Sequence, residues 1–176
     1  IWNLDRENVI SDTGSFGFQT HQWLTINGQK YVSLQTARNK IQMFKVVQSR
    51  NNGYQFVEDN KYELVYSSNK GADATINFCD FDHDFQHIFL VTDACVLEKR
   101  AVQDINAVIS RIDLQERVSD STLRNFRLSA DGKYCAIGGG GDKPYFYVID
   151  IANEEQMKLD SSVLTSTYVP CFINGE

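Results

Sequence analysis

Three aspartates alternate in the segment CDFDHDFQ, at Asp80, Asp82 and Asp84. Calcium loops begin with this spacing, because it crowds carboxylates round a hard cation. Such a loop also needs glycine near its sixth position and a bidentate carboxylate at its twelfth. Phe85 and Val91 hold those positions, and Phe85 is expected to block the sharp turn. The segment is therefore interpreted as a solvated hairpin at the end of a strand, without a metal.

His83 and His87 have the i, i+4 spacing that binds zinc when it lies on a helix. Here the two residues flank a predicted hairpin, so their side chains need not converge and a solvated turn is expected. His21, the third histidine, is expected to pack against or cap a strand end. No Ser/His/Asp or Cys/His arrangement can be assembled around a recognisable nucleophile motif. We therefore predict no catalytic residue and no enzyme activity.

The run Gly138–Gly141 could suggest a phosphate-binding loop. Phosphate loops place their glycines at the start of a helix, whose N-terminal amides hold the anion. The following YFYVIDI is a strand pattern, and no Lys-Ser or Lys-Thr pair follows the run. We interpret the run as a flexible hairpin, and we expect no cofactor and no small-molecule ligand.

Cysteine usage indicates the compartment. Cys79, Cys135 and Cys171 each fall inside a predicted strand, Cys95 is the fourth cysteine, and no Cys-x-x-Cys pair occurs. Cysteine in a strand behaves as a small buried hydrophobe. Structural thiols favour a reducing environment, so the sequence predicts an intracellular protein, cytoplasmic or nuclear.

Composition excludes several classes of protein. The 176 residues are 42% hydrophobic and 23% charged, as in a folded globular domain. A net charge of −6 argues against direct nucleic-acid binding, which needs clustered lysine and arginine. No run of 18 apolar residues occurs, so no membrane span is expected.

The clearest structural unit is Asn125–Ile151. Asn125–Ser129 has the period-2 pattern of a half-buried strand, Tyr134–Ile137 is a second strand, and Tyr145–Ile151 is a third. The intervening Ala130–Lys133 is a tight turn, in which Gly132 supplies a positive φ. A meander of three short strands cannot bury both faces alone, so it needs neighbours of its own kind.

Similar units occur at His21–Val47 and Thr75–Val102. A fourth, outer strand is expected at Lys61–Tyr66 and at Ala107–Asp113, although the second segment also fits a helical spacing. A polar connection is expected at Glu154–Leu164. A repeat of roughly 40–55 residues with one four-stranded sheet each is typical of a β-propeller.

One repeat also carries a family resemblance. The turn Ser129–Lys133, the hairpin residue Asp142 and the strand end Ile149-Asp150 resemble a repeat of the WD-repeat (tryptophan–aspartate) propellers. Ile1–Asp5 (IWNLD) resembles the same strand end, with Asn3 in place of aspartate. The resemblance implies an all-β propeller of four-stranded antiparallel blades, and about three complete blades are present with partial ones beside them. We expect a segment of a longer chain, with a blade end at 1–19, blades at 20–66, 74–118 and 123–164, and the start of a blade at 165–176.

The function expected of such a fold is a non-enzymatic protein–protein interaction scaffold, a subunit of a larger assembly that binds other protein subunits. Two alternatives remain open: a regulator of a small GTPase that acts like an exchange factor, for which Gly138–Gly141 is the one candidate loop, and a propeller enzyme with a site in its channel. In a scaffold the hairpins between second and third strands are expected to carry recognition; the alternative is that these hairpins are solvated turns and that partners bind the rim or the opposite face. The residues predicted to bind protein are Arg38, Asn39, Lys40, Asp93, Asp142, Lys143 and Tyr145.

Overall fold

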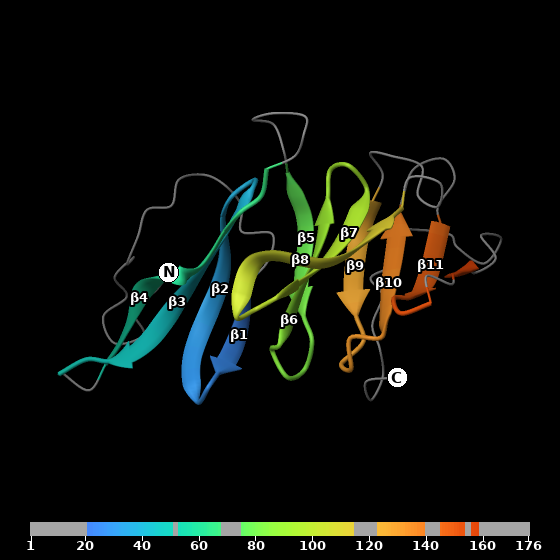
Figure 1. Ribbon diagram of the computed structural model, residues 1–176. Coiled ribbons are helices and arrows are strands. Elements are labelled where there is room, and N and C mark those ends of the chain that lie inside the picture. Colours follow the sequence, from blue (N-terminus) through green and yellow to red (C-terminus); the bar gives the residue numbers. More distant parts are fainter. Residues whose placement is uncertain are drawn as a thin grey trace. The chain divides into compact units, whose positions relative to one another are not determined.

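The computed structural model describes residues 21–50, 53–67, 75–114, 123–139, 145–153 and 156–158 (Figure 1). The predicted partial blades at 1–19 and 165–176, together with Asp142, Lys143 and Cys171, lie outside these residues. The described part of the chain is all β, without a helix, and it divides into two compact units, residues 1–75 and 76–176. None of the described residues forms a helix long and apolar enough to cross a membrane.

The first unit contains one four-stranded antiparallel sheet with the order β1-β2-β3-β4. Its strands are β1 (His21–Ile26), β2 (Gln29–Ala37), β3 (Lys40–Gln48) and β4 (Tyr54–Val65). Asn27 and Gly28 join β1 to β2 with φ values of 51° and 78°, the left-handed pair that a two-residue hairpin requires. One face of the sheet buries Val32, Leu34 and Phe44.

The second unit contains two four-stranded antiparallel sheets, with the orders β5-β6-β7-β8 and β9-β10-β11-β12. The strands of one sheet are β5 (Ile76–Phe81), β6 (His87–Thr92), β7 (Val96–Ala101) and β8 (Asp104–Asp113). The strands of the other are β9 (Leu123–Leu128), β10 (Tyr134–Gly139), β11 (Tyr145–Asp150) and β12 (Gln156–Lys158). Four antiparallel strands in chain order are the topology of a propeller blade, and the all-β class and the four-stranded sheets are as predicted.

Two strand predictions need correction, and the strand predicted at Ala107–Asp113 is confirmed. The outer strand β4 begins at Tyr54, not at Lys61, because its first half pairs with the far end of β3. The expected polar connection at Glu154–Leu164 contains β12, which pairs with Tyr147–Ile149 of β11. The helical alternative for the segment around Ala107 is wrong, since the whole segment belongs to β8.

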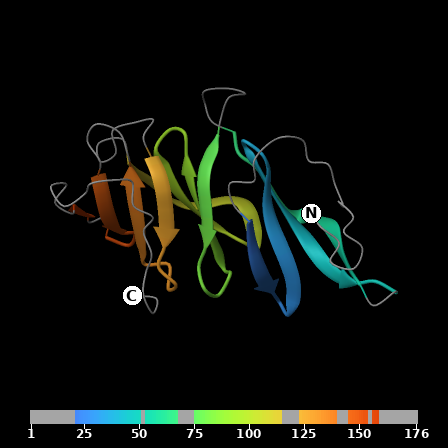
Figure 2. The ribbon, with the colours of Figure 1, turned by 180° about the vertical axis from the view of Figure 1, so that it is seen from behind.

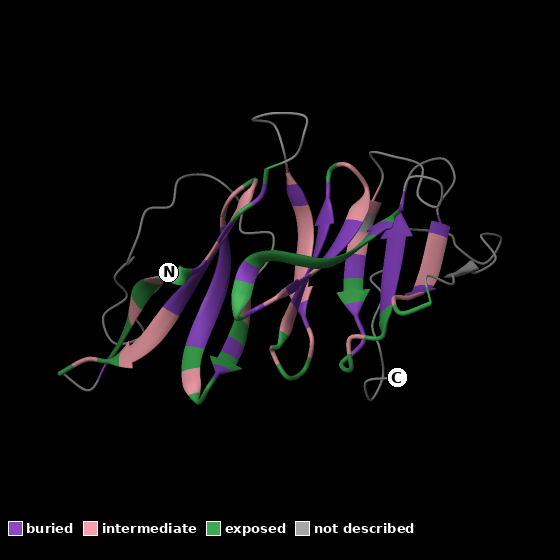
Figure 3. Cartoon of the chain, in the orientation of Figure 1, coloured by how far each residue is buried: buried purple, intermediate pink, exposed green. Residues whose placement is uncertain are grey.

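The two sheets of the second unit pack face to face over one apolar core, and β5 and β9 lie side by side (Figure 2). Aromatic, aliphatic and cysteine side chains from both sheets make up this core: Phe89, Val91, Leu97, Ile112, Leu114, Phe126, Leu128, Cys135, Ile137, Tyr145 and Ile149. Figure 3 shows the same pattern as buried strand centres between exposed turns. Cys79, Cys95 and Cys135 are thiols.

Polar contacts join the first strands and turns of these two sheets. Asp80 Oδ2 accepts a hydrogen bond from the Leu128 amide at 3.3 Å, and the His83 amide donates to the Ala130 carbonyl at 2.8 Å. Gly132 has a φ of 68°, as predicted, and a Cβ there would lie 3.2 Å from Asp82 Cβ. The turn between β9 and β10 therefore docks directly on the turn between β5 and β6.

The turn between β5 and β6 is built round Asp82 and is not simply solvated. Asp82 Oδ1 accepts the amides of Gln86 and His87 at 2.9 and 3.0 Å, and Oδ2 lies 2.6 Å from His87 Nδ1. His87 is thus a half-buried partner of Asp82, while His83 is exposed. Phe85 does not block the turn: it adopts a φ of 53°, and its amide donates to the Asp82 carbonyl at 3.0 Å.

Replacement of Gly132 by valine should destabilise the second unit by about 1–3 kcal/mol, because a β-branched residue would hold a left-handed φ and would crowd Asp82 and Phe89. Urea unfolding of the whole chain measures the loss. Gly28→Val is the matched control, since Gly28 has a φ of +78° but open space around it. An equal loss in both variants would show that crowding between the turns contributes nothing.

Asp131 makes the same turn sensitive to acid. Its Oδ1 accepts the Lys133 amide at 3.0 Å and the Ser129 hydroxyl at 2.7 Å, and these bonds, the amide first, hold the pKa of Asp131 below its usual value. A carboxyl whose pKa is lowered by folding stabilises the fold above its unfolded pKa and loses that contribution as the pH falls through the folded pKa. Asp131→Asn should therefore lower stability at neutral pH and converge on wild type below about pH 4 in pH-dependent thermal unfolding. A constant difference down to pH 2 would contradict this assignment.

Candidate interaction site

The hairpin between β2 and β3 holds three of the residues predicted to bind protein. Its backbone is fixed from both sides: Gln35 Nε2 donates to the Arg38 carbonyl at 3.1 Å, and the Tyr66 amide donates to the Asn39 carbonyl at 2.7 Å. Asn39 Nδ2 donates back to the Tyr66 carbonyl at 3.2 Å. These two hydrogen bonds between Asn39 and Tyr66 tie the hairpin to the end of β4. The conformation of the hairpin is therefore fixed by contacts within the sheet.

The three side chains of this hairpin differ in what they can offer a partner. Lys40 Nζ lies 2.9 Å from Glu63 Oε2 on β4, and both side chains are about one-third exposed. Asn39 is half-buried and committed to Tyr66, whereas Arg38 is exposed. The structure therefore brings the predicted residues together but leaves Arg38 as the exposed cation of the hairpin.

Asp93 lies exposed on the equivalent hairpin of the second unit, between β6 and β7. This turn is closed by the Cys95 amide, which donates to the Thr92 carbonyl at 3.0 Å. Cys95 has a φ of 55°, and its carbonyl accepts the Leu114 amide at 2.8 Å. Asp93 is thus carried on an ordered turn that is tied to the outer end of its sheet.

Tyr145 is not on the surface, although the sequence places it beside an exposed hairpin. It begins β11, it is only 7% exposed, and it belongs to the core between the two sheets. Its register partner is Gly139, and the Tyr145 ring occupies the space that a Cβ of Gly139 would need. The glycine run therefore begins inside β10, which ends at Gly139 and not at the predicted Ile137, and the glycine makes room for the tyrosine.

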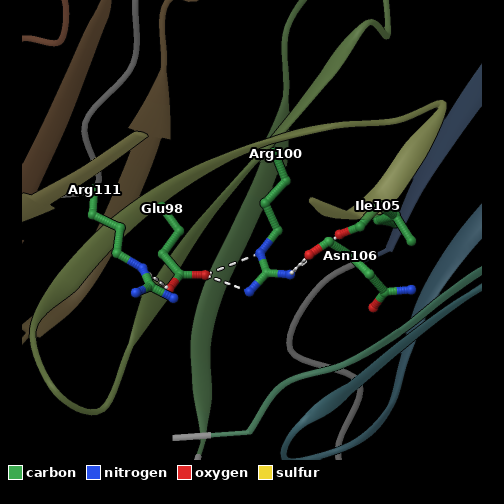
Figure 4. A network of polar contacts seen from close by, with 5 residues as sticks. All are labelled: Glu98, Arg100, Ile105, Asn106 and Arg111. Carbon is green, nitrogen blue, oxygen red and sulfur yellow. Dashed lines mark hydrogen bonds and ion pairs between the residues drawn. The ribbon is translucent and has the colours of Figure 1, made fainter. Parts of the chain in front are cut away.

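A charged network that the sequence analysis did not identify lies in the sheet β5–β8 (Figure 4). Glu98 of β7 accepts hydrogen bonds from Arg100 at 2.6 and 2.9 Å through Oε2, and from Arg111 Nε of β8 at 2.8 Å through Oε1. The side chains of Glu98, Arg100 and Arg111 are 2%, 8% and 63% exposed. Glu98 and Arg100 are thus buried, whereas Arg111 is exposed to solvent.

Arg100 also shapes the outer strand. Its Nη1 donates to the carbonyls of Ile105 and Asn106 at 3.3 and 3.2 Å, where β8 bulges away from β7. A bulge takes backbone groups out of the ladder, so an internal donor is needed to satisfy them. The alternation of Glu98 and Arg100 within VLEKRA places both on one face of β7 and is the one signal by which the sequence could have revealed the pair.

Two of the three carboxylates that resemble a calcium loop accept hydrogen bonds from backbone amides. Asp80 Oδ1 accepts the Phe81 amide at 2.9 Å, and Asp82 is engaged in its own turn. Among the described residues no group of three histidine, cysteine, aspartate or glutamate side chains is placed to hold a metal ion.

Replacement of Glu98 by leucine should cost about 3–5 kcal/mol, because it leaves Arg100 without its counter-charge. The double variant Glu98→Leu, Arg100→Met removes both charges and should recover part of that loss. Chemical unfolding of both variants measures the difference. A double variant that is less stable than the single one would mean that Arg100 contributes mainly through the carbonyls of β8.

No family model and no curated protein matches this sequence. Solved structures do match the chain in fold. It is similar to the C-terminal WD40 domain of Sif2, with a TM-score of 0.54 and 8% identity over 81% of this chain and 37% of that one. It is also similar to the dihydro-heme d1 dehydrogenase NirN, solved in complex with DHE, with a TM-score of 0.52 and 13% identity over 78% of this chain and 27% of that one.

At these identities the similarity shows the fold alone. The chain spans about a quarter to two-fifths of the length of the two proteins. One of the two is a WD40 domain and the other is an enzyme by name, so the shared fold does not select between binding and catalysis. The comparisons establish that the described sheets are blades of the β-propeller type.

Proposed function

We propose that this chain is a non-enzymatic scaffold, a propeller-type subunit that binds other protein subunits of a larger assembly through the hairpins between second and third strands. The observation that carries the proposal is the β2–β3 hairpin, whose backbone is locked to β4 while Arg38 stays exposed.

Rigidity is what makes this hairpin suited to binding. A loop that is ordered before association loses less conformational entropy when a partner docks on it. The Asn39–Tyr66 pair and the Lys40–Glu63 ion pair supply this order from within the blade. The proposed binding energy then comes from Arg38, since arginine is one of the side chains that most often dominate protein interfaces.

Asp93 extends the proposal to the second unit, because its turn is also fixed by backbone bonds at both ends. Asp93 presents a negative charge on this turn, which suits a basic group on a partner. Charge complementarity of this kind contributes to specificity and association rate more than to affinity.

Charge reversal at Arg38 tests the proposal in the full-length protein. Arg38→Glu should reduce recovery of at least one co-purifying protein by about tenfold, measured by quantitative mass spectrometry after affinity purification. Lys30→Glu, the same charge change on an exposed residue at the other end of β2, is the matched control and should keep every partner. Lys40 is left unchanged, because its reversal would place two carboxylates together at Glu63.

Equal thermal unfolding of both variants and wild type establishes that neither change alters the fold. An unchanged set of partners at unchanged abundance in Arg38→Glu would overturn the assignment of this hairpin as a binding site.

A further inference from the structure

The outer edge of β8 pairs with no other strand among the described residues. β8 is the last strand of its sheet, and its central segment Ile105–Ser110 contains no charge, no lysine and no proline. Val108 and Ile109 are 36% and 53% exposed, and Figure 3 shows most of β8 as exposed. Soluble proteins normally place charges on such edges, because an apolar edge is a template for another strand.

The outer strand β4 of the first unit shows the usual protection. Its central part carries Glu58, Asp59, Lys61 and Glu63 within six residues. The central part of the outer strand is therefore charged in β4 and uncharged in β8, although β4 also exposes Tyr54, Val57 and Val65 outside that part. A general requirement of the fold does not account for the apolar edge of β8.

The charged network of Glu98, Arg100 and Arg111 fixes the backbone of β8. Arg100 binds the Ile105 and Asn106 carbonyls from the inner side, and Glu98 is joined to Arg111 across the β7–β8 pair. The strand runs over Asp104–Asp113 with two register irregularities in its pairing with β7. A partner strand thus meets a preformed edge, which lowers the entropic cost of binding.

The charge of the network selects the chemistry of the partner. It contains two guanidinium groups and one carboxylate, so it carries an excess positive charge, and Arg111 is the member that is exposed to solvent. A carboxylate opposite Arg111 would complete the pairing with a charge-assisted hydrogen bond. Asp113 lies on the same side of β8, two residues further on, so it disfavours a second acidic residue and favours a basic one there.

We propose that the edge of β8 binds an extended segment of a partner protein by antiparallel strand addition. The segment has the pattern basic–x–acidic–x–aliphatic, with its acidic residue opposite Arg111 and its aliphatic residue against Val108 and Ile109. Main-chain hydrogen bonds supply affinity in this mode, and alternate side chains supply specificity. The proposal does not rest on the hairpins of the proposed function.

A synthetic peptide tests the proposal directly. Fluorescently labelled Thr-Val-Lys-Thr-Glu-Thr-Val-Thr should bind the complete chain in an anisotropy titration, and the peptide with its lysine and glutamate exchanged should bind about tenfold more weakly, the scale of a hydrogen bond to a charged group. Two further peptides are N-methylated, one at its odd-numbered and the other at its even-numbered residues. One of them should lose binding and the other should keep it, because only one set of amides faces β8. No binding of the first peptide, or equal binding of both, would overturn the proposal.

Variants of the chain locate the site. Ile109→Lys, at a side chain that is half exposed, should abolish peptide binding without a change in unfolding temperature. Arg111→Gln should weaken binding about tenfold, while Arg127→Gln, the same change at an exposed arginine of β9, should leave it unaltered. If Ile109→Lys instead converts a self-associated chain to monomer and no peptide binds, the occupant is a second copy and the proposal fails.

Discussion

Face-to-face packing of two small sheets is the interaction on which the second unit depends. A sheet of four short strands cannot bury its faces alone, and β5–β8 and β9–β12 each present one apolar face to the other. Phe89 and Ile137 are fully buried within this shared core. Because the two sheets approach closely, a Cβ at position 132 would crowd Asp82 and Phe89, and glycine avoids this contact.

Local pattern was sufficient to predict most of the fold. Alternation of apolar and polar residues located the inner strands, and the Ser129–Lys133 turn was found because glycine is the residue that tolerates its φ. The errors fall where pairing, and not side-chain pattern, decides the structure. β12 has only three residues and exists because β11 offers it an edge, while β10 continues to Gly139, where no side chain could contribute a pattern.

The positions of the hairpins were predictable from the sequence, but the surroundings of their side chains were not. Hairpins between second and third strands followed from counting strands, and Arg38 and Asp93 are exposed there. Some hairpin side chains contact residues that are distant in sequence, as Lys40 contacts Glu63, and such contacts are not visible in the local pattern. Tyr145 was assigned to the surface because it follows a glycine-rich turn, yet the register opposite Gly139 turns it into the core.

The buried charges of β7 are better explained by geometry than by stability. An ion pair such as Glu98–Arg100 gains little net free energy over apolar residues of similar volume, because both groups lose hydration. Apolar residues could not, however, donate to the carbonyls of Ile105 and Asn106, which the bulge removes from the ladder. Without those donors β8 would have to straighten against β7 or leave polar groups unsatisfied. The pair therefore fixes the course of the outer strand, and through Glu98 it also fixes the position of Arg111 on that strand.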